Sequence, residues 1–330
     1  YLVITPEACS SILFHTRNRA NEAASVSQIT SREGFELGIV DILVPEPEGP
    51  AHRFKEQAIT SLHSHLEKTV TKIQSIPTGK LFSGRIEKWS KIGHWSKVTI
   101  EEVNAIQRKV SRLPVPNNDD YLKRHKGCYT TNGIHKYDPI RFDKLKNDGF
   151  VCDVCGHRYT RPSIWDCIDN IFDEGSFTEH AKTKLIVDKD ILGFHEYKDK
   201  IKGARKRTGL MTSMITGDAK IMGHDIVFCG ADFGFFGASF CMCTGEKIWI
   251  AAEIAIKNKN PIILQAAGGG ARMHEGCSSM VSIPKVHVAL TRVELAGLPV
   301  ITIITDPTLG GVAIGYGSRG IRLFQKHAGN

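Results

Sequence analysis

Two glycine-rich stretches directly follow apolar runs with the pattern of buried strands. They are Gly268-Gly-Gly-Ala-Arg-Met-His-Glu-Gly276 and Asp306-Pro-Thr-Leu-Gly-Gly-Val312. Glycine lets backbone N–H groups point into a cleft without side-chain obstruction, and such groups at a helix N-terminus bind anions. Aimed at a developing oxyanion, one donor contributes about 2.7–4 kcal/mol where it has been measured. The alternative is a tight turn that needs positive φ, and spacing alone leaves both interpretations open.

A second candidate for chemistry is the pair Cys152-Asp-Val-Cys155, which supplies half of a tetrahedral zinc site. With Cys128 and His135 upstream it would complete a Cys3His set. The alternative is a group of ordinary reduced thiols. The chain has nine cysteines, an odd number, and no visible secretion signal, which favours reduced thiols over a disulfide framework. We therefore expect a reducing, cytoplasmic location.

Three further groups are weaker candidates. His274 and Glu275 follow the first glycine turn and would face its cleft, although packing roles are commoner for such a pair. Cys241 and Cys243 lie among small residues and are expected in the core rather than as reactive thiols. The run Arg205-Lys-Arg207 offers a phosphate contact, or simply a solvated turn.

Charge is unevenly distributed along the 330 residues. The net charge is +8, and Lys80 to Lys146 contains 15 basic and 7 acidic residues, so this stretch carries the whole excess. A basic stretch of this kind attracts nucleic acid, acidic protein or a phosphate-bearing ligand, or serves as a solvated linker. No uncharged apolar run approaches the roughly 18 residues of a membrane helix, so we expect no membrane span.

The elements that must position the glycine turns follow one plan from about residue 203. Strand patterns at 225–229, 261–265 and 299–305 each lead through small residues into a helix pattern, which predicts an α/β domain of layered units. Upstream, the patterns predict helices at 8–14, 20–29 and 52–76 and short strands at 1–5 and 38–44. Residues 77–127 give weak signals, and residues 128–157 are turn-rich.

These motifs together resemble the carboxyltransferase of multi-subunit bacterial acetyl-CoA carboxylase. Residues 152 to 311 resemble the β subunit, most specifically in Gly-Gly-Ala-Arg-Met and Asp-Pro-Thr-x-Gly-Gly-Val. Residues 1 to about 95 resemble the C-terminal part of the α subunit, through Tyr1-Leu-Val-Ile-Thr-Pro-Glu-Ala-Cys9 and Ile42-Leu-Val-Pro-Glu-Pro-Glu-Gly-Pro50. We therefore expect a fused chain in which the α-like part comes first. We also expect this chain to be a middle segment of a longer α-like and β-like sequence.

The resemblance implies a crotonase-like α/β fold of layered ββα units with a small zinc-ribbon-like segment. It implies four parts, which are an α-like portion at 1–95, a basic linker at 96–127, a zinc-ribbon-like segment at 128–160 and a β-like portion at 161–330. By motif position, Gly269 and Gly270 would hold the thioester enolate oxygen. Gly310, Gly311 and Arg205 would contact substrate, and Cys128, His135, Cys152 and Cys155 would bind Zn²⁺.

The implied reaction moves a carboxyl group from carboxybiotin, borne on a separate carrier protein, to acetyl-CoA. The product is malonyl-CoA, and the reaction opens fatty acid synthesis. The implied partners are acetyl-CoA, biotin carboxyl carrier protein, biotin carboxylase and further copies of the chain. Alternatives are a carboxyltransferase for another acyl-CoA, a biotin-dependent decarboxylase, an inactive assembly element, or a zinc-ribbon nucleic-acid binder that uses the basic stretch.

Overall fold

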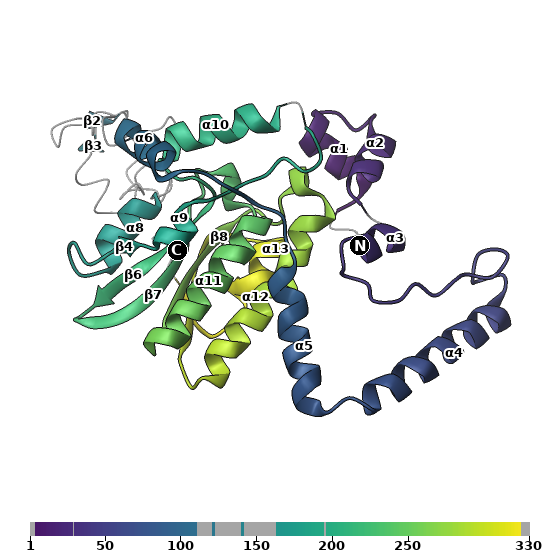
Figure 1. Ribbon diagram of the computed structural model, residues 1–330. Helices are drawn as coiled ribbons and strands as arrows, with labels where there is room; N and C mark the ends of the chain where they lie inside the picture. Colours follow the sequence, from purple (N-terminus) through teal and green to yellow (C-terminus); the bar gives the residue numbers. More distant parts are fainter. Residues whose placement is uncertain are drawn as a thin grey trace, which may run out of the picture.

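The computed structural model describes residues 4–28, 30–110, 121–122, 140–141, 163–194 and 196–324. Its centre is a six-stranded sheet in the order β10-β9-β8-β7-β6-β4 (Figure 1). These strands are β4 (Thr178–Glu179), β6 (Met214–Ile221), β7 (His224–Ala231), β8 (Ile262–Gly268), β9 (Val300–Thr308) and β10 (Ile321–Phe324). Strands β4, β6 and β7 pair antiparallel, whereas β7, β8, β9 and β10 run parallel.

Apolar residues cover both faces of the sheet, because side chains alternate along each strand. Val227 and Cys229 of β7 point into one core cluster, and Ile226 and Phe228 point into the other. The first cluster lies under the helices α11 (Met242–Asn258) and α12 (Cys277–Leu295). The second lies under α8 (Ile164–Ile171) and α10 (Tyr197–Thr208). The predicted α/β class with layered units is therefore confirmed.

Short elements connect these layers. They are β1 (Ser96–Lys97), which pairs with β5 (Ile186–Val187), β2 (Tyr121–Leu122), which pairs with β3 (Ile140–Arg141), α9 (Ala181–Lys184), η1 (Phe236–Ala238), η2 (Met273–Glu275), α13 (Gly310–Val312) and η3 (Ala313–Gly317). The turn segments η1, η2 and α13 each follow one of the parallel strands. They therefore gather at the carboxyl edge of the sheet, where ligands of α/β proteins bind.

The N-terminal segment is helical. It contains α1 (Pro6–Phe14), α2 (Ala20–Val26), α3 (Ser31–Glu36), α4 (Lys55–Gln74) and α5 (Thr78–Lys91). Helices α1 and α2 pack on each other beside the sheet domain, and α5 packs along α12, whereas α4 extends away from the body (Figure 1). None of the residues of α4 is buried.

One sequence prediction for this part of the chain differs from the structure. The predicted strand at 38–44 is an irregular segment. It pairs with no strand among the described residues, and its N-terminal end folds back on Gly34, whose carbonyl accepts from Ile39 and Val40. The described part of the segment predicted as a basic linker begins with β1 (Ser96–Lys97) and a helix. Helix α6 (Ile100–Val110) packs against α10 and buries Val103 in a small apolar cluster.

In the part of the chain that the structure describes, no helix combines the length and the apolar character that crossing a bilayer requires.

Candidate functional site

The two glycine turns meet at the ends of the adjacent parallel strands β8 and β9. The N–H of Leu309 donates to the carbonyl of Gly268 across 3.0 Å. A Cβ built on Gly310 would lie 3.5 Å from the Cα of Gly270, and one built on Gly311 would lie 3.1 Å from the nitrogen of Ala271. The absence of side chains thus lets the two turns approach at backbone distance.

Three backbone N–H groups at this junction are unpaired within the part of the chain that the structure describes. Within the described residues, the N–H groups of Gly270, Gly310 and Gly311 donate to no protein acceptor. The N–H of Gly269 is already used, since it donates to the carbonyl of Gly237 across 3.0 Å. Gly269 and Gly310 are exposed, whereas Gly270 and Gly311 are buried. The junction therefore combines exposed glycine faces with unpaired donors, which suits an anionic oxygen.

Backbone conformation explains why glycine is needed at two of these positions. Gly270 has φ +122° and Gly310 has φ +48°, in the region where an L side chain is strained. Gly269 differs, because its backbone is ordinary and a Cβ built there would meet nothing within 4 Å. A side chain at position 269 would thus project into open space above the junction.

A third loop belongs to the site, and sequence reasoning missed it. The connection from β7 to α11 includes η1, where Gly237 accepts from Gly269 and has φ +60°. A Cβ on Gly268 would meet the carbonyl oxygen of Ala238 at 2.5 Å, so the backbones of the two loops are in direct contact. The Gly-Ala-Ser sequence at 237–239 was available as a signal, but its distance from residue 268 in sequence concealed the contact.

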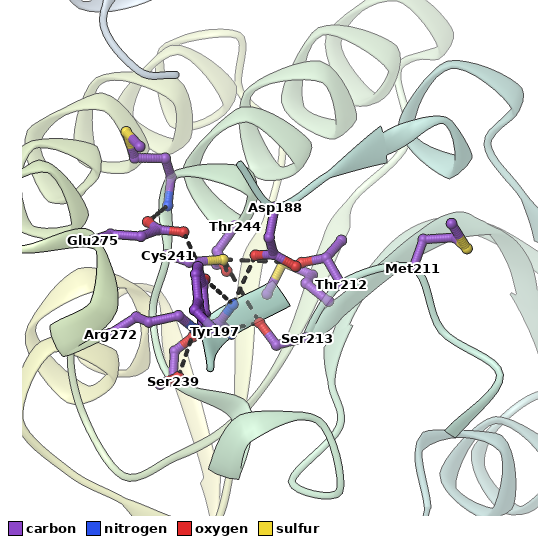
Figure 2. A network of polar contacts seen from close by, with 12 residues as sticks. Asp188, Tyr197, Met211, Thr212, Ser213, Ser239, Cys241, Thr244, Arg272 and Glu275 are labelled. Atoms are coloured by element: carbon purple, nitrogen blue, oxygen red, sulfur yellow. Dashed lines mark hydrogen bonds and ion pairs between the residues drawn. The ribbon is translucent and has the colours of Figure 1, made fainter. Parts of the chain in front are cut away.

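The first glycine turn rests on a buried ion pair. Nη1 of Arg272 donates to Oδ1 of Asp188 across 2.7 Å, Nε donates to Oγ of Ser239 across 2.9 Å and Nη2 donates to the Ser239 carbonyl across 3.1 Å (Figure 2). The backbone N–H of Arg272 donates to the carbonyl of Phe240, whose own N–H donates to the carbonyl of Gly270. Arg272 is 1% exposed. Its guanidinium thus links the first glycine turn to Asp188 and Ser239 and holds the turn in position.

Tyr197 and Glu275 extend this network. The Tyr197 hydroxyl accepts from Nη1 of Arg272 at 3.4 Å and donates to Oε1 of Glu275 at 3.5 Å (Figure 2). Oε2 of Glu275 accepts from the backbone N–H of Met242 at the start of α11 across 2.8 Å. His274 stacks on the Tyr197 ring with centroids 4.7 Å apart. The interpretation of His274 and Glu275 as packing residues is therefore confirmed.

Burial controls the protonation of these groups. Desolvation raises the pKa of Asp188 to about 7, although the charge of Arg272 opposes the shift. Desolvation and the neighbouring Cys241 raise the pKa of Glu275 well above its usual value. Desolvation and the charge of Arg272 lower the pKa of His274 to about 4, so this imidazole is neutral at physiological pH. Cys241 and Cys243 are both fully buried, as expected for core residues.

The remaining predicted site residues lie elsewhere. Arg205, on α10, donates from Nε to the carbonyl of Met211 across 3.2 Å and is half-buried. The structure joins it to neither glycine turn by a direct contact among the described residues. The predicted zinc ligands Cys128, His135, Cys152 and Cys155 all lie outside the described residues.

The N-terminal segment packs directly behind the site. The N–H of Cys277 in α12 donates to the carbonyl of Ser27 across 3.0 Å, and Met273 of η2 shares an apolar cluster with Cys9 and Leu13 of α1. Further along α12, Nζ of Lys285 donates to the carbonyls of Ser90 and Ile92. The two halves of the chain therefore form one body around the glycine junction.

Two family models match the chain. Residues 1–93 match the model described as acetyl co-enzyme A carboxylase carboxyltransferase-like, and residues 166–320 match the carboxyl transferase domain. Because carboxyl transferase domains imply the crotonase-like fold expected above, the second match confirms that expectation for residues 166–320.

Curated relatives carry the same description. Over 176 residues the chain is 38% identical to the acetyl-coenzyme A carboxylase carboxyl transferase subunits beta/alpha of Clostridium tetani, covering 53% of this chain and 30% of that protein. Over 170 residues it is 39% identical to the carboxyl transferase subunit beta of Clostridium novyi, covering 52% of this chain and 58% of that protein. A crystal structure of transcarboxylase 12S aligns with a TM-score of 0.43 and 22% identity over 56% of this chain and 32% of that one.

The chain thus spans less than two thirds of the length of the curated relatives it matches. The fused relative names its subunits in the order beta/alpha, whereas here the segment that matches the first family model precedes the carboxyl transferase domain. Residues 1–93 are therefore similar to the acetyl co-enzyme A carboxylase carboxyltransferase-like family, and residues 166–320, which follow them, are similar to the carboxyl transferase domain.

Proposed function

We propose that this chain supplies part of the acyl-CoA site of an acetyl-CoA carboxyltransferase, which moves a carboxyl group from carboxybiotin to acetyl-CoA to give malonyl-CoA. The observation that carries the proposal is the junction of the two glycine turns, where Gly270, Gly310 and Gly311 leave backbone donors unpaired. It lies within a carboxyl transferase domain, at the carboxyl edge of the parallel strands.

The chemistry needs few titrating side chains. When bound, carboxybiotin supplies the carboxyl group and, after carbon dioxide leaves, a basic ureido nitrogen that takes the methyl proton of acetyl-CoA. The protein then has to align the two reactants and stabilise the negative oxygen of the thioester enolate. In the proposed arrangement the Gly270 N–H holds the enolate oxygen, and Gly310 and Gly311 border the reacting groups. Gly269 contributes an open, side-chain-free surface.

The buried pair of Arg272 and Asp188 has a positioning role in this proposal. The Arg272 guanidinium holds Ser239, and the N–H of the next residue, Phe240, donates to the Gly270 carbonyl, so the network holds the turn in place before substrate arrives. Preorganised donors are effective because they need no reorganisation during the reaction. Arg205 remains proposed as a substrate contact from the motif position alone.

The proposed partners are acetyl-CoA, a biotin carboxyl carrier protein with its biotin carboxylase, and further copies of the chain. We also propose the four-part division at residues 95, 127 and 160, and Zn²⁺ bound by Cys128, His135, Cys152 and Cys155. The matches to carboxyltransferase models support a biotin-borne carboxyl donor.

The test is a steady-state assay of malonyl-CoA formation by the full-length protein with its carboxylated carrier. Gly269→Val places a branched side chain in the open space above the junction without backbone strain. We expect kcat/KM to fall at least about tenfold, a loss of about 1.4 kcal/mol of transition-state stabilisation, while the melting temperature stays unchanged. The matched control is Gly203→Val on α10, where a Cβ also meets nothing within 4 Å.

Equal activity of the Gly269→Val and Gly203→Val proteins would exclude the junction as the reaction site. A panel of acetyl-, propionyl- and glutaconyl-CoA tests the acyl group. Preference for either of the latter two would replace acetyl-CoA by that substrate while leaving the site assignment in place.

A further inference from the structure

A second cluster of chemically active side chains lies beneath the glycine junction. Asp188, Cys241 and Cys243 each offer one donor atom, and these three atoms lie within 4.8 Å of one another with all three residues buried. Asp188 directly follows β5, Cys241 directly precedes α11, and Cys243 lies in the first turn of that helix. Figure 2 shows Asp188 and Cys241 next to each other, with Thr244 beside them.

We propose that Oδ2 of Asp188 and the Sγ atoms of Cys241 and Cys243 form a binding site for a thiophilic divalent cation, with Zn²⁺ as the ion that this donor set fits. Two thiolates and a carboxylate oxygen are ligands that Zn²⁺ takes in proteins. These residues are distinct from Cys128, His135, Cys152 and Cys155, and the metal site shares Asp188 with the ion pair that positions the first glycine turn.

The first support is an oxygen without a partner. Oδ1 of Asp188 accepts from Arg272 across 2.7 Å, but Oδ2 is buried and accepts no hydrogen bond from the residues that the structure describes. A buried polar atom in this state is costly, and each such atom in a native protein calls for an explanation. A cation between Oδ2 and the two sulfurs supplies the missing partner, while Arg272 keeps its place on Oδ1 as an orienting neighbour.

The second support is the geometry of the sulfurs. With Zn–S bonds of about 2.3 Å, tetrahedral ligands lie about 3.8 Å apart. The three donor atoms all lie within 4.8 Å of one another, so one ion between them can contact all three once their side chains rotate toward it. Oγ1 of Thr244 lies 3.3 Å from Sγ of Cys241 and is the nearest hydroxyl for a fourth position.

The third support is the charge of the cluster. With a metal bound, two thiolates and the Asp188 carboxylate would carry three negative charges, and Arg272 supplies one positive charge. A divalent cation supplies the other two. Two further cations face the cluster, but Nζ of Lys247 is held by the Met214 carbonyl and Nε of Arg205 by the Met211 carbonyl, so neither occupies Oδ2.

All three proposed ligands are buried, so the ion enters as the chain folds, and the thiols lose their protons when they bind it.

The experiment measures metal content without any substrate. The full-length protein with Cys128, Cys152 and Cys155 changed to Ser is produced in zinc-supplemented medium, dialysed and analysed by mass spectrometry for metals. We expect one Zn²⁺ per chain in this background. Adding Cys241→Ser and Cys243→Ser should remove it. The matched control, Cys229→Ser, changes a thiol that is equally buried on β7 but outside the cluster, and should retain the ion.

A second measurement avoids dependence on folding of the double variant. Zinc X-ray absorption of the unmutated cluster in the same background should show two sulfur neighbours and lighter oxygen neighbours. Absence of zinc, zinc without sulfur neighbours, or a pair of oxidised cysteines in place of two free thiols would each overturn the proposal. Retention of zinc by the Cys241→Ser, Cys243→Ser protein would do the same.

Discussion

Arg272 and Asp188 form an ion pair 2.7 Å long in which the two side chains are 1% and 0% exposed. The residues are 84 positions apart in sequence, and the pair joins the segment after β5 to the glycine turn after β8. A charge pair with so little contact with water has no solvent to replace a lost partner. Its effect on stability and on the shape of the turn is therefore directly testable.

Replacing Arg272 by Met should destabilise the fold by about 3–5 kcal/mol, because it leaves a buried carboxylate without its partner. Urea denaturation measures this change. Arg292→Met is the control, since the pair of Arg292 and Glu253 is 25% and 51% exposed and should cost about 0–1 kcal/mol. Restoring much of the loss in the double variant Arg272→Met, Asp188→Asn would identify the unpaired charge as the cause. Equal effects of the Arg272 and Arg292 variants would contradict this account.

The contrast between Gly268 and Gly269 gives a stability test of the junction itself. Gly268→Ala forces a Cβ to within 2.5 Å of the Ala238 carbonyl oxygen at a φ of +153°, whereas Gly269→Ala meets nothing within 4 Å. We expect the first to lower the free energy of unfolding by about 1–3 kcal/mol or more, and the second to leave it nearly unchanged. Thermal unfolding of both proteins distinguishes them. Similar melting temperatures would mean that the two loops are not in contact.

The stability of the protein at acid pH should depend on the buried imidazole of His274. Its folded pKa of about 4 lies below the usual 6.5, so between these values the unfolded chain binds the extra proton. The contribution of His274 to stability is therefore present above pH 6.5 and is lost as the pH falls towards 4. His274→Phe keeps the stacking on Tyr197 and removes the titration. Denaturation midpoints at several pH values should show a shallower acid loss in the variant, and identical profiles would exclude this role.

Lys285 offers a test of the contact between the two halves. Its ammonium is buried, donates to the carbonyls of Ser90 and Ile92 at 3.1 and 2.8 Å, and pairs with Glu246 at 2.5 Å. Lys285→Met should destabilise the protein by about 3–5 kcal/mol by leaving Glu246 unpaired, and should speed amide exchange around residues 85–95. Lys257→Met, on the exposed side of α11, is the control. Unchanged exchange in this segment would show that Lys285 does not hold it.

The sequence predicted most reliably what depends on local pattern. The apolar runs and small-residue turns predicted β7, β8 and β9 with the helices between them, because a strand covered on both faces needs continuous apolar residues. The strand prediction failed at 38–44, where a similar apolar run pairs with no strand among the described residues. The sequence also predicted no helix at 78–91 or 100–110, since the apolar residues of α5 and α6 form only short clusters separated by polar and charged residues.

Within the site, the two glycine turns were identifiable because glycine is required at a close backbone approach. The supporting network was not, because nothing in local spacing brings Asp188 and Tyr197 to Arg272. Long-range pairing of this kind is decided by how the layers stack. The unpaired Oδ2 of Asp188 and the loop at 237–239 became visible only through their contacts.

The N-terminal segment and the sheet domain belong to one polypeptide, and this lowers the binding free energy that the contacts between them must supply. Separate subunits lose translational and rotational freedom when they meet, a cost of about 4–15 kcal/mol that their contacts must exceed. Here the Ser27 and Ser90 contacts to α12 form within one polypeptide, so their encounter is intramolecular and independent of dilution. The contacts between the two segments are one buried ammonium, a few backbone hydrogen bonds and a small apolar cluster, and they need not offset the entropy cost of association. The two segments also occur in a fixed one-to-one ratio.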